Sequence, residues 1–421
     1  MTSDARRTLD AVWRIESARI IATLTRMVGD VGLAEDFAQD GLVAALESWP
    51  EKGVPDNPGA WLTTTAKRRA IDHLRRSERL DRKHEELGQE LEVLKEIDGA
   101  AEPGARLGES VKDDVLRLIF MCCHPVLSAE AQIALTLRLP GGLTTREIAR
   151  AFLVPTSTLA QRIVRAKRTL REARVPFEVP PEDELPERLS SVLGVVYLIF
   201  NEGYAATSGE GWFRPRLCGE ALRLGRILAG LVPDEPEVQG LLSLMEIQAS
   251  RLPARTGPEG EPVLLPDQDR SRWDRLLIRR GFGALRRAVE LGAPLGPYTL
   301  QAAIAACHAR AGTSEDTDWE RIAALYDALA RIAPSPVVEL NRAVAVGRAY
   351  GPEAGLEVIE RAGEGGILDG YHHLPAVRGD LLERLGRLDA ARKEFERAAS
   401  LTRNEAERRV LRKRAAGCTP V

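Results

Sequence analysis

The stretch from Leu143 to Arg171, LTTREIARAFLVPTSTLAQRIVRAKRTLR, limits the fold more tightly than any other part of this chain. Thr144 and Glu147 have the spacing of a capping box, which closes the start of a helix. The pattern breaks before Thr156 and then resumes, so we expect a second helix with Thr156 as a candidate cap. Apolar residues of this second helix recur at spacings of four, three and four and predict a buried stripe: Leu159, Ile163, Ala166 and Leu170.

The second predicted helix is also basic. From Leu137 to Arg174 there are nine Lys or Arg residues and two Glu residues. A short capped helix, a turn and a basic helix are typical of a helix-turn-helix, whose second helix enters the major groove of DNA. Taken alone, the segment also fits a helical hairpin with a solvated basic face.

Overall composition favours helices and an intracellular location. The chain has 421 residues, enough for two to four domains, and Ala, Leu, Arg and Glu dominate it. Its net charge of −3 confines any DNA binding to local patches. Five scattered Cys residues without a CxxC pair suit a reducing cytoplasm. The N-terminal stretch MTSDARRTLD has no apolar signal region, and the uncharged run SSVLGVVYLIFN is too short to span a bilayer. We therefore expect a cytoplasmic protein that makes no membrane contact.

The pattern along the chain predicts an all-α fold, in which two small helical domains precede a large helical array. From His84 to Asp114 there are ten acids and three Lys or Arg residues, which indicates an acidic linker. A second break, VPFEVPPEDELPER, contains prolines that disfavour regular structure. The expected parts are a helical domain at 5–81, the acidic linker at 82–112, a helix-turn-helix domain at 113–175, a linker at 176–188, a middle helical domain at 189–300 and a repeat-like helical domain at 301–415.

The C-terminal part shows weak self-similarity. GPEAGLEVIERA at 351–362 resembles GRLDAARKEFERAA at 386–399, and each follows an apolar helical segment. The spacing from Ala354 to Ala391 is 37 residues, close to the roughly 34-residue helix pair called TPR. Helical hairpins that bury their faces against each other are therefore expected here.

Charges separate sharply near the N-terminus. From Val31 to Glu51 there are five acids and no Lys or Arg, and Glu35 belongs to the expected acidic face. From Ala60 to Lys83 there are eight Lys or Arg residues and three acids. An acidic helix followed by a basic helix predicts two different partners, one basic and one a polyanion. The alternative is a pair of ordinary amphipathic helices with solvated charges.

Three stretches resemble a known family. AEDFAQDGLVAALESW resembles region 2.2 of sigma-70-type RNA polymerase sigma factors, GAWLTTTAKRRAIDHLRR resembles regions 2.3 to 2.4, and the Leu143–Arg171 stretch resembles region 4.2. Their order, with a short linker and no region 3, is similar to the extracytoplasmic-function (ECF) group. NEGYAATSGE at 201–210 and DQDRSRWD at 267–274 are similar to a C-terminal extension found in one ECF group, where TPR-like helices follow.

The resemblance implies a function and its site residues. The protein would bind core RNA polymerase through its β′ and β subunits and bind promoter DNA, without being an enzyme itself. The matching polymerase-binding positions are Leu33, Asp36, Phe37, Gln39 and Asp40. The −10 element would meet Trp61, Lys67, Arg68, Asp72, Arg75 and Arg76, of which Trp61 also fits the core. The −35 element would meet Thr156, Ser157, Ala160, Gln161 and Arg162, with Arg165 and Lys167 on phosphates.

The chain departs from the family pattern in three places. Arg68 stands where the family commonly has Asn, and the loop SWPEKGVPDNPGAW lacks the usual aromatic-Arg-Gly run. Pro155 replaces the usual capping Ser of the recognition helix. These departures leave the −10 sequence and the first −35 contacts open.

Other chemistry-bearing residues do not form a recognisable site in the sequence. Cys122-Cys123-His124 and the pair His372-His373 lack a second ligand pair at zinc spacing, so we expect no metal and no cofactor. No phosphate-binding loop, Rossmann glycine fingerprint or GxSxG motif is present. Polar and aromatic residues concentrate in the middle domain: Asn201, Glu202, Tyr204, Trp212, Asp269, Arg270, Arg272, Trp273 and Asp274. They could line a groove for a ligand or partner, or they could form buried hydrogen bonds that hold the helices together. We prefer the structural interpretation.

The sequence thus predicts a sigma factor with a C-terminal regulatory extension, which could contact the sigma domains within the same chain. Two other classes of protein stay open. One is a helix-turn-helix transcription factor that binds duplex DNA without polymerase. The other is a TPR-like scaffold for protein interactions.

Overall fold

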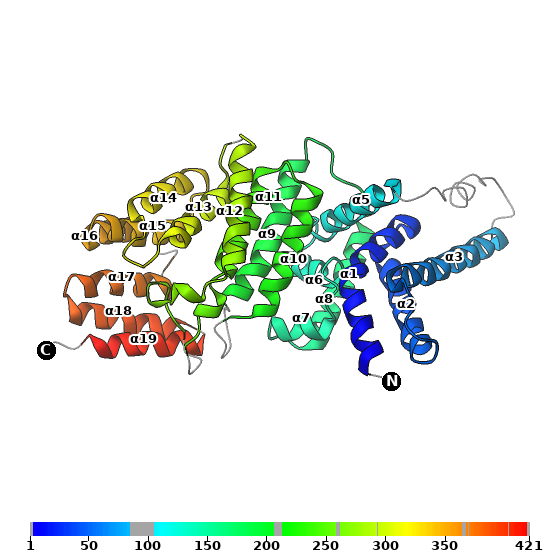
Figure 1. Cartoon of the computed structure of the whole chain (residues 1–421), viewed down its shortest axis with the longest axis horizontal. Helices are drawn as coiled ribbons and strands as arrows, with labels where there is room; N and C mark the ends of the chain where they lie inside the picture. The colour runs from blue at the N-terminus through cyan, green and yellow to red at the C-terminus, as the bar shows by residue number, and fades with distance from the viewer. Residues whose placement is uncertain are drawn as a thin grey trace. The chain divides into compact units, whose positions relative to one another are not determined.

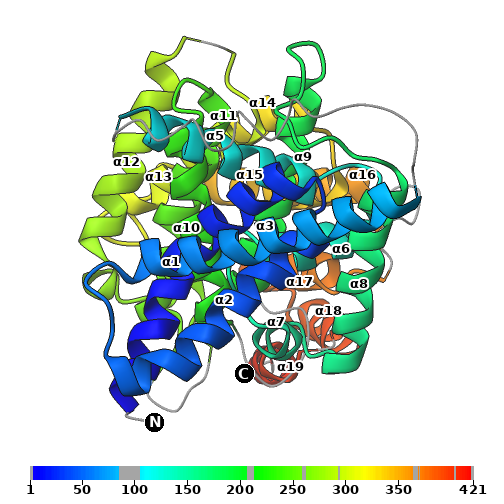
Figure 2. The ribbon, with the colours of Figure 1, turned by 90° about the vertical axis from the view of Figure 1, so that its right-hand side faces the viewer.

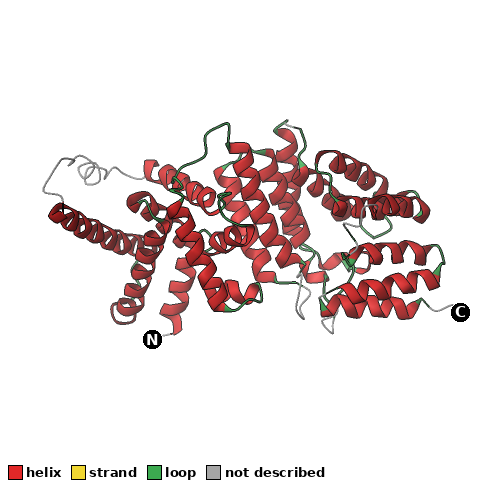
Figure 3. Ribbon diagram, turned by 180° about the vertical axis from the view of Figure 1, so that it is seen from behind, coloured by secondary structure: helices red, strands yellow, loops and turns green. Residues whose placement is uncertain are grey.

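The computed structural model describes residues 3–84, 105–205, 213–257, 262–292, 294–363, 368, 370–402 and 404–418, with side chains undescribed at 3–7, 10, 77–84, 105–112 and 362–363. Within these residues the regular secondary structure is helical and no strand is present (Figure 3). An isolated β-bridge joins Thr256 and Pro262. The all-α prediction is confirmed. None of the described helices is both long and apolar enough to cross a membrane.

The chain forms two compact units, residues 1–196 and 197–421. The first unit begins with three long helices, drawn in blue in Figures 1 and 2: α1 (Ser3–Val28), α2 (Val31–Lys52) and α3 (Pro58–His84). Asp30 caps α2, since its Oδ1 accepts hydrogen bonds from the amides of Gly32 (2.7 Å) and Leu33 (2.9 Å). Gly41 of α2 lies directly over Ala66 of α3, which lets the two helices approach closely.

The helix-turn-helix expected from the sequence is present in the same unit. It consists of α5 (Ala105–Cys122), α6 (Ala129–Arg138), α7 (Thr145–Ala151) and α8 (Thr156–Glu172). The capping box at the start of α7 is confirmed, and the predicted stripe of α8 is buried: Leu159, Ile163, Ala166 and Leu170. The prediction that Thr156 caps α8 is wrong. Pro155 occupies the cap position in extended backbone, and no side chain there accepts a hydrogen bond.

The predicted linkers fit the structure only in part. Most of the acidic linker lies outside the described residues, but α5 already begins at Ala105, inside the segment assigned to that linker. Helix α9 (Leu185–Tyr204) begins within the predicted second linker and runs across the division between the two units. The Pro-rich residues before Leu185 remain non-helical, as their missing amide donors and fixed backbone angles require.

The second unit continues with α10 (Pro215–Leu231), α11 (Pro236–Ala249), α12 (Arg275–Glu290) and α13 (Pro297–Arg310). Three 3₁₀ turns lie in the irregular insert between α11 and α12: η1 (Leu252–Ala254), η2 (Leu265–Asp267) and η3 (Arg270–Arg272). Glu237 of α11 joins α11 to α13, because its carboxylate accepts hydrogen bonds from the amides of Tyr298 (2.7 Å) and Thr299 (3.1 Å).

The C-terminal part is a series of helices, each packed on its neighbour in sequence. They are α14 (Trp319–Ile332), α15 (Pro336–Ala349), α16 (Pro352–Gly363), α17 (His373–Arg384), α18 (Leu388–Leu401) and α19 (Glu405–Gly417). Both self-similar sequences form the second helix of a hairpin, α16 and α18 (Figure 1). Phe395 of α18 is fully buried against Gly379 of α17, and α17–α19 lie side by side in Figures 1 and 3. The expected helical hairpins are therefore present.

Gly240→Ala is expected to destabilise the second unit. A Cβ atom at Gly240 would lie 2.7 Å from the amide nitrogen and 2.9 Å from the Cα of Thr299, both backbone atoms that cannot move alone. Such overpacking typically costs about 1–3 kcal/mol. The midpoint of chemical unfolding, followed by circular dichroism, should therefore fall.

Gly219→Ala in α10 provides the matched control. Gly219 lies in an exposed part of the helix, and nothing would come within 4 Å of its Cβ atom. Ala at such a position is expected to stabilise the helix by up to about 1 kcal/mol. Equal effects of both substitutions would contradict the tight crossing of α11 and α13.

Candidate functional site

Helix α2 presents an acidic outer face. Asp36, Asp40 and Glu47 are exposed on it, and Val43 lies between them with 47 % of its surface exposed. Their spacing of four, three and four residues places all four on one side of the helix. An apolar side chain surrounded by carboxylates is suited to a partner surface with basic residues around an apolar patch.

The remaining predicted polymerase-binding residues are less accessible. Phe37 is buried, and its ring contacts His73 of α3 with ring centroids 5.3 Å apart. Leu33 and Gln39 are half-buried, and Gln39 donates a hydrogen bond to Glu35 (2.7 Å). The structure thus places Phe37 in the core of the first unit, where it holds α2 against α3.

Glu35 is the largest departure from the expected acidic face. Only 3 % of its side chain is exposed, because it faces the helix-turn-helix helices rather than solvent. Arg138 Nε of α6 donates to its Oε1 at 2.6 Å, and Lys167 Nζ of α8 pairs with its Oε2. Arg138 and Lys167 are themselves only 18 % and 17 % exposed. Burial opposes ionisation of Glu35, but these two cations outweigh it and lower the pKa of the carboxyl.

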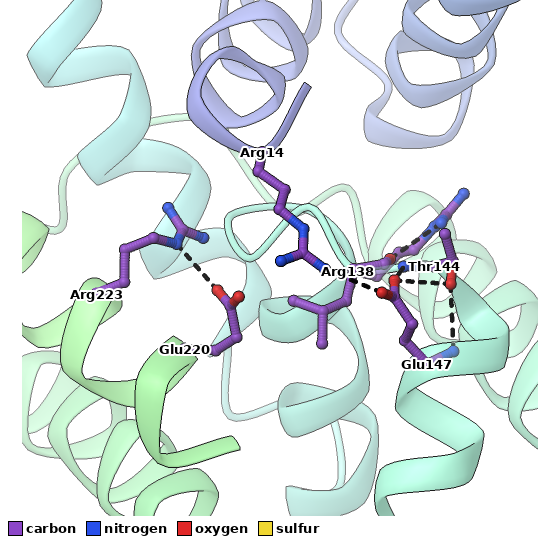
Figure 4. Close-up of polar contacts among 7 residues, drawn as sticks. Arg14, Arg138, Thr144, Glu147, Glu220 and Arg223 are labelled. Atoms are coloured by element: carbon purple, nitrogen blue, oxygen red, sulfur yellow. Dashed lines mark hydrogen bonds and ion pairs between the residues drawn. The ribbon is translucent and has the colours of Figure 1, made fainter. Parts of the chain in front are cut away.

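Two further ion pairs join the same parts of the first unit. Arg171 of α8 pairs with Asp30, the residue that caps α2. Burial opposes ionisation of Asp30, yet Arg171 and the capped amides lower its pKa overall. Arg14 of α1 lies 3.0 Å from Glu147, which also accepts a hydrogen bond from the amide of Thr144 (2.9 Å) in the capping box (Figure 4).

Helix α3 carries the predicted −10 residues on a well-defined face. Leu62, Ala66 and Ala70 are buried at intervals of four residues, so the opposite side points to solvent. Four predicted residues are exposed there together: Arg68, Asp72, Arg75 and Arg76. Lys67 is half-buried beside them. This arrangement offers cations along one helix edge, which can follow a phosphate backbone.

Trp61 lies at the start of α3 and packs inward. Its ring meets the buried Trp49 edge-on, with centroids 5.6 Å apart. Trp61 itself is half-buried. Packing against Trp49 explains why an aromatic residue stands at position 61, and no DNA contact is needed for that explanation.

Some of the predicted −35 residues on α8 are exposed to solvent, whereas Lys167 is engaged in an ion pair. Thr156, Ser157, Ala160 and Gln161 are exposed in the first turns of α8, and Arg165 is exposed further along. Arg162 is half-buried. Lys167 and Arg171 instead pair with carboxylates of the α2 segment.

A cavity of about 400 Å³ lies between α6 and α8. Its walls include Val126, Glu130 and three polar residues of α8, namely Gln161, Arg162 and Arg165. Gln161 and Arg165 are exposed, so these side chains can reach outward from the rim of the cavity.

Cys122 and Cys123 pack in the core of the first unit. Both thiols are buried, and burial raises the pKa of Cys123 to about 12. Gln132 donates hydrogen bonds to the carbonyls of Cys123 (3.1 Å) and His124 (3.0 Å), which fixes the turn between α5 and α6. Burial keeps these thiols protonated and suits them to the core beneath the helix-turn-helix.

The polar set of the middle domain consists largely of structural hydrogen bonds where it is described. Asp269 and Asp274 cap η3 and α12. Arg270 is buried and donates to the carbonyls of His308 (2.7 Å) and Ala311 (2.8 Å) at the end of α13, while Trp273 is buried beside it. Glu202 pairs with Arg214. Trp212 lies outside the described residues.

Two parts of the first unit thus carry helix surfaces of opposite charge, the acidic α2 and the basic α3 and α8. This combination, with a helix-turn-helix, is typical of a protein that binds nucleic acid and has a separate acidic helix surface. Residues 14–80 match the family Sigma-70 region 2, residues 117–170 match Sigma-70, region 4, and residues 188–289 match a family of unknown function, DUF6596.

Similar proteins agree with these matches. An uncharacterized protein of Rhizobium meliloti (strain 1021) is 45 % identical over 93 % of this chain and 91 % of that protein. The probable ECF RNA polymerase sigma factor SigI of Mycobacterium tuberculosis is 27 % identical over 41 % of this chain and 58 % of SigI. The ECF RNA polymerase sigma factor SigK of Mycobacterium bovis is 29 % identical over 37 % of this chain and 79 % of SigK. The chain belongs to the ECF group of the sigma-70 family of RNA polymerase sigma factors and carries a large C-terminal extension.

Glu35→Gln is expected to destabilise the first unit by about 3–5 kcal/mol, because it leaves two buried cations without their carboxylate. The folded-state pKa of Glu35 lies below its ordinary value of 4.5. Its contribution is therefore complete above pH 4.5 and is lost as the pH falls through the folded-state pKa. The difference in unfolding free energy between wild type and variant should shrink in the same pH range.

Glu47→Gln on the exposed face of the same helix is the matched control and should change stability by less than about 0.5 kcal/mol. Chemical unfolding of both variants from neutral to acidic pH measures the two effects. A Glu35→Gln variant as stable as wild type at neutral pH would show that the buried cluster contributes nothing.

Proposed function

We propose that this protein binds core RNA polymerase and directs it to promoters that contain −35 and −10 elements, where transcription then begins. The observation that carries the proposal is the presence of sigma regions 2 and 4, in order, on one chain with an acidic docking helix and two basic helix faces. The protein itself is not an enzyme in this role, and it acts in the cytoplasm, where the polymerase works.

The acidic face of α2 is the proposed polymerase-binding surface. Asp36 and Asp40 would meet basic residues of the β′ subunit, and Val43 would supply an apolar contact at the centre. Leu33 and Gln39 lie at the edge of this face, whereas buried Phe37 would hold α2 in place. A contact of the helix-turn-helix part with the β subunit completes the proposed interface.

Promoter contacts are divided between α3 and α8. Arg68, Arg75 and Arg76 would hold phosphates near the −10 element, with Lys67, Asp72 and Trp61 at the margin of the same surface. The first turns of α8 would enter the major groove at −35. There Gln161 and Arg162 are the side chains whose chemistry can distinguish bases.

Lys167 can contact DNA only after its ion pair with Glu35 opens. Its ammonium group is held by Glu35, so it can neutralise a DNA phosphate only when that ion pair opens. The assigned parts, from the helical domain at 5–81 to the TPR-like domain at 301–415, remain our proposed division of the chain. A regulatory contact of the extension with the sigma domains likewise remains a proposal.

Asp36→Ala is expected to weaken binding to core polymerase about tenfold, or about 1.4 kcal/mol, because it removes one exposed carboxylate from the docking face. Asp56→Ala, an exposed acid in the loop before α3, is the matched control and should bind like wild type. Affinity is measured with labelled full-length protein and purified bacterial core polymerase at fixed salt. If both variants lost the same affinity for core polymerase, the loss would come from the change in the protein's net charge and not from the acidic face of α2.

Gln161→Ala and Arg165→Ala should have different effects on promoter use. Loss of a base contact at Gln161 should cost about 1–3 kcal/mol at one −35 position and relax its sequence preference. Loss of a phosphate contact at Arg165 should weaken binding to all promoters equally and reduce the salt dependence of affinity by about one counterion. Run-off transcription by full-length protein and core polymerase on a random −35/−10 library measures both.

The same experiment separates the alternative functions. Tight sequence-specific binding to duplex DNA without polymerase would favour a stand-alone transcription factor. No specific initiation, no polymerase binding and no effect of Gln161→Ala in folded protein would overturn the sigma function and favour a scaffold.

A further inference from the structure

Three metal-ligating side chains come together near the end of the chain. His372 occupies the cap position of α17, His373 is the first residue of that helix, and Glu407 lies in the first turn of α19. Ligand atoms of the three side chains all lie within 4.8 Å of one another. No other group of three His, Cys, Asp or Glu side chains with this property occurs in the described part of the chain.

The distances are close to those of a zinc site. His372 Nε2 lies 3.0 Å from Glu407 Oε2, and the two imidazole rings have centroids 3.9 Å apart. In a tetrahedral zinc site with bonds of about 2.0–2.1 Å, neighbouring ligand atoms lie about 3.3 Å apart. Small side-chain rotations therefore suffice to bring all three ligand atoms to bonding distance.

A neighbouring side chain already orients the carboxyl group of Glu407. Buried Thr402 donates a hydrogen bond from Oγ1 to Glu407 Oε2 (2.6 Å), as neighbouring groups do for metal-binding carboxylates. The cluster brings together one carboxyl group and two imidazoles, a ligand set that suits a divalent transition metal.

One ring nitrogen of the cluster, Nε2 of His372, has no hydrogen-bond partner among the described residues. His372 Nε2 is inaccessible to solvent, and its contact with Glu407 does not have hydrogen-bond geometry within the described structure. A buried imidazole nitrogen facing a carboxylate oxygen without a good hydrogen bond is satisfied when a cation lies between them. His373 is exposed, so an ion can reach the cluster from solvent.

We propose that His372, His373 and Glu407 bind one divalent transition-metal ion, for which Zn²⁺ is the appropriate probe. Each histidine supplies one ring nitrogen and Glu407 supplies its carboxylate, which leaves the fourth position of a tetrahedral ion for water. The ion connects the start of α17 to the first turn of α19 and thereby fastens the last helix of the extension. This site is independent of the polymerase and DNA surfaces of the first unit.

Isothermal titration of chelator-treated full-length protein with Zn²⁺ tests the site. We expect one ion per chain, and we expect His373→Ala or Glu407→Gln to weaken binding by about tenfold or more. His73→Ala, which removes an exposed histidine of α3, should bind like wild type. Co²⁺ in place of Zn²⁺ should give the visible absorption of a tetrahedral ion, and this absorption should disappear in Glu407→Gln.

The thermal unfolding midpoint gives a second readout, because an ion that binds only the folded chain raises the midpoint as its concentration rises. Because His373 is exposed, we expect its replacement to leave the fold intact, and the unfolding midpoint of the metal-free variant checks this. A dissociation constant weaker than about 1 mM for wild type, or Zn²⁺ binding that Glu407→Gln and His373→Ala leave unchanged, would overturn the proposal.

Discussion

The carboxylate of Glu35 is the interaction on which the first unit depends. It is buried where α2, α6 and α8 meet, and Arg138 and Lys167 balance its charge. An unpaired charge at such a depth costs several kcal/mol, so the three groups stabilise the unit only as a set. Asp30 with Arg171 and Arg14 with Glu147 surround this centre with more exposed pairs that salt screens more strongly. The buried set therefore determines how α8 lies against α2.

This arrangement links the two proposed activities physically. The outer face of α2 is exposed, with Asp40 paired to Arg69 of α3 at 3.3 Å. The carboxylates on its other side pair with Lys167 and Arg171 of α8, two cations that the proposed function would otherwise offer to DNA. Phosphate groups can replace Glu35 and Asp30 as partners of Lys167 and Arg171, because both are anions that accept charge-assisted hydrogen bonds. The base-reading first turns of α8 do not take part in this exchange. In the proposed function, sequence readout by Gln161 and phosphate binding by Lys167 would thus be separable steps.

Local features of the sequence predicted the fold well. The stripe of α8, the capping box at Thr144 and Glu147 and the helical hairpins near the C-terminus follow from spacing within one or two helices. Glu35 could not be assigned in this way. Its neighbours Asp36 and Gln39 suggested a solvated acidic face, but its partner Arg138 lies 103 residues away. The burial of Phe37 could not be predicted either, since a helix with apolar residues on two sides does not reveal which side is the core.

The extension shows the same contrast between local and distant partners. Arg270 belongs to a polar, aromatic sequence that resembles a ligand site, yet its guanidinium binds backbone carbonyls at the end of α13. Such bonds satisfy the last turn of a helix and leave little capacity for a ligand. In the sequence, His372 and His373 stand side by side with no third ligand near them. Only the folded chain brings the carboxylate of Glu407 next to them as the third proposed ligand. Because Thr402 fixes that carboxylate from outside the cluster, its orientation comes from the fold of α18 and α19 and exists before any ion binds.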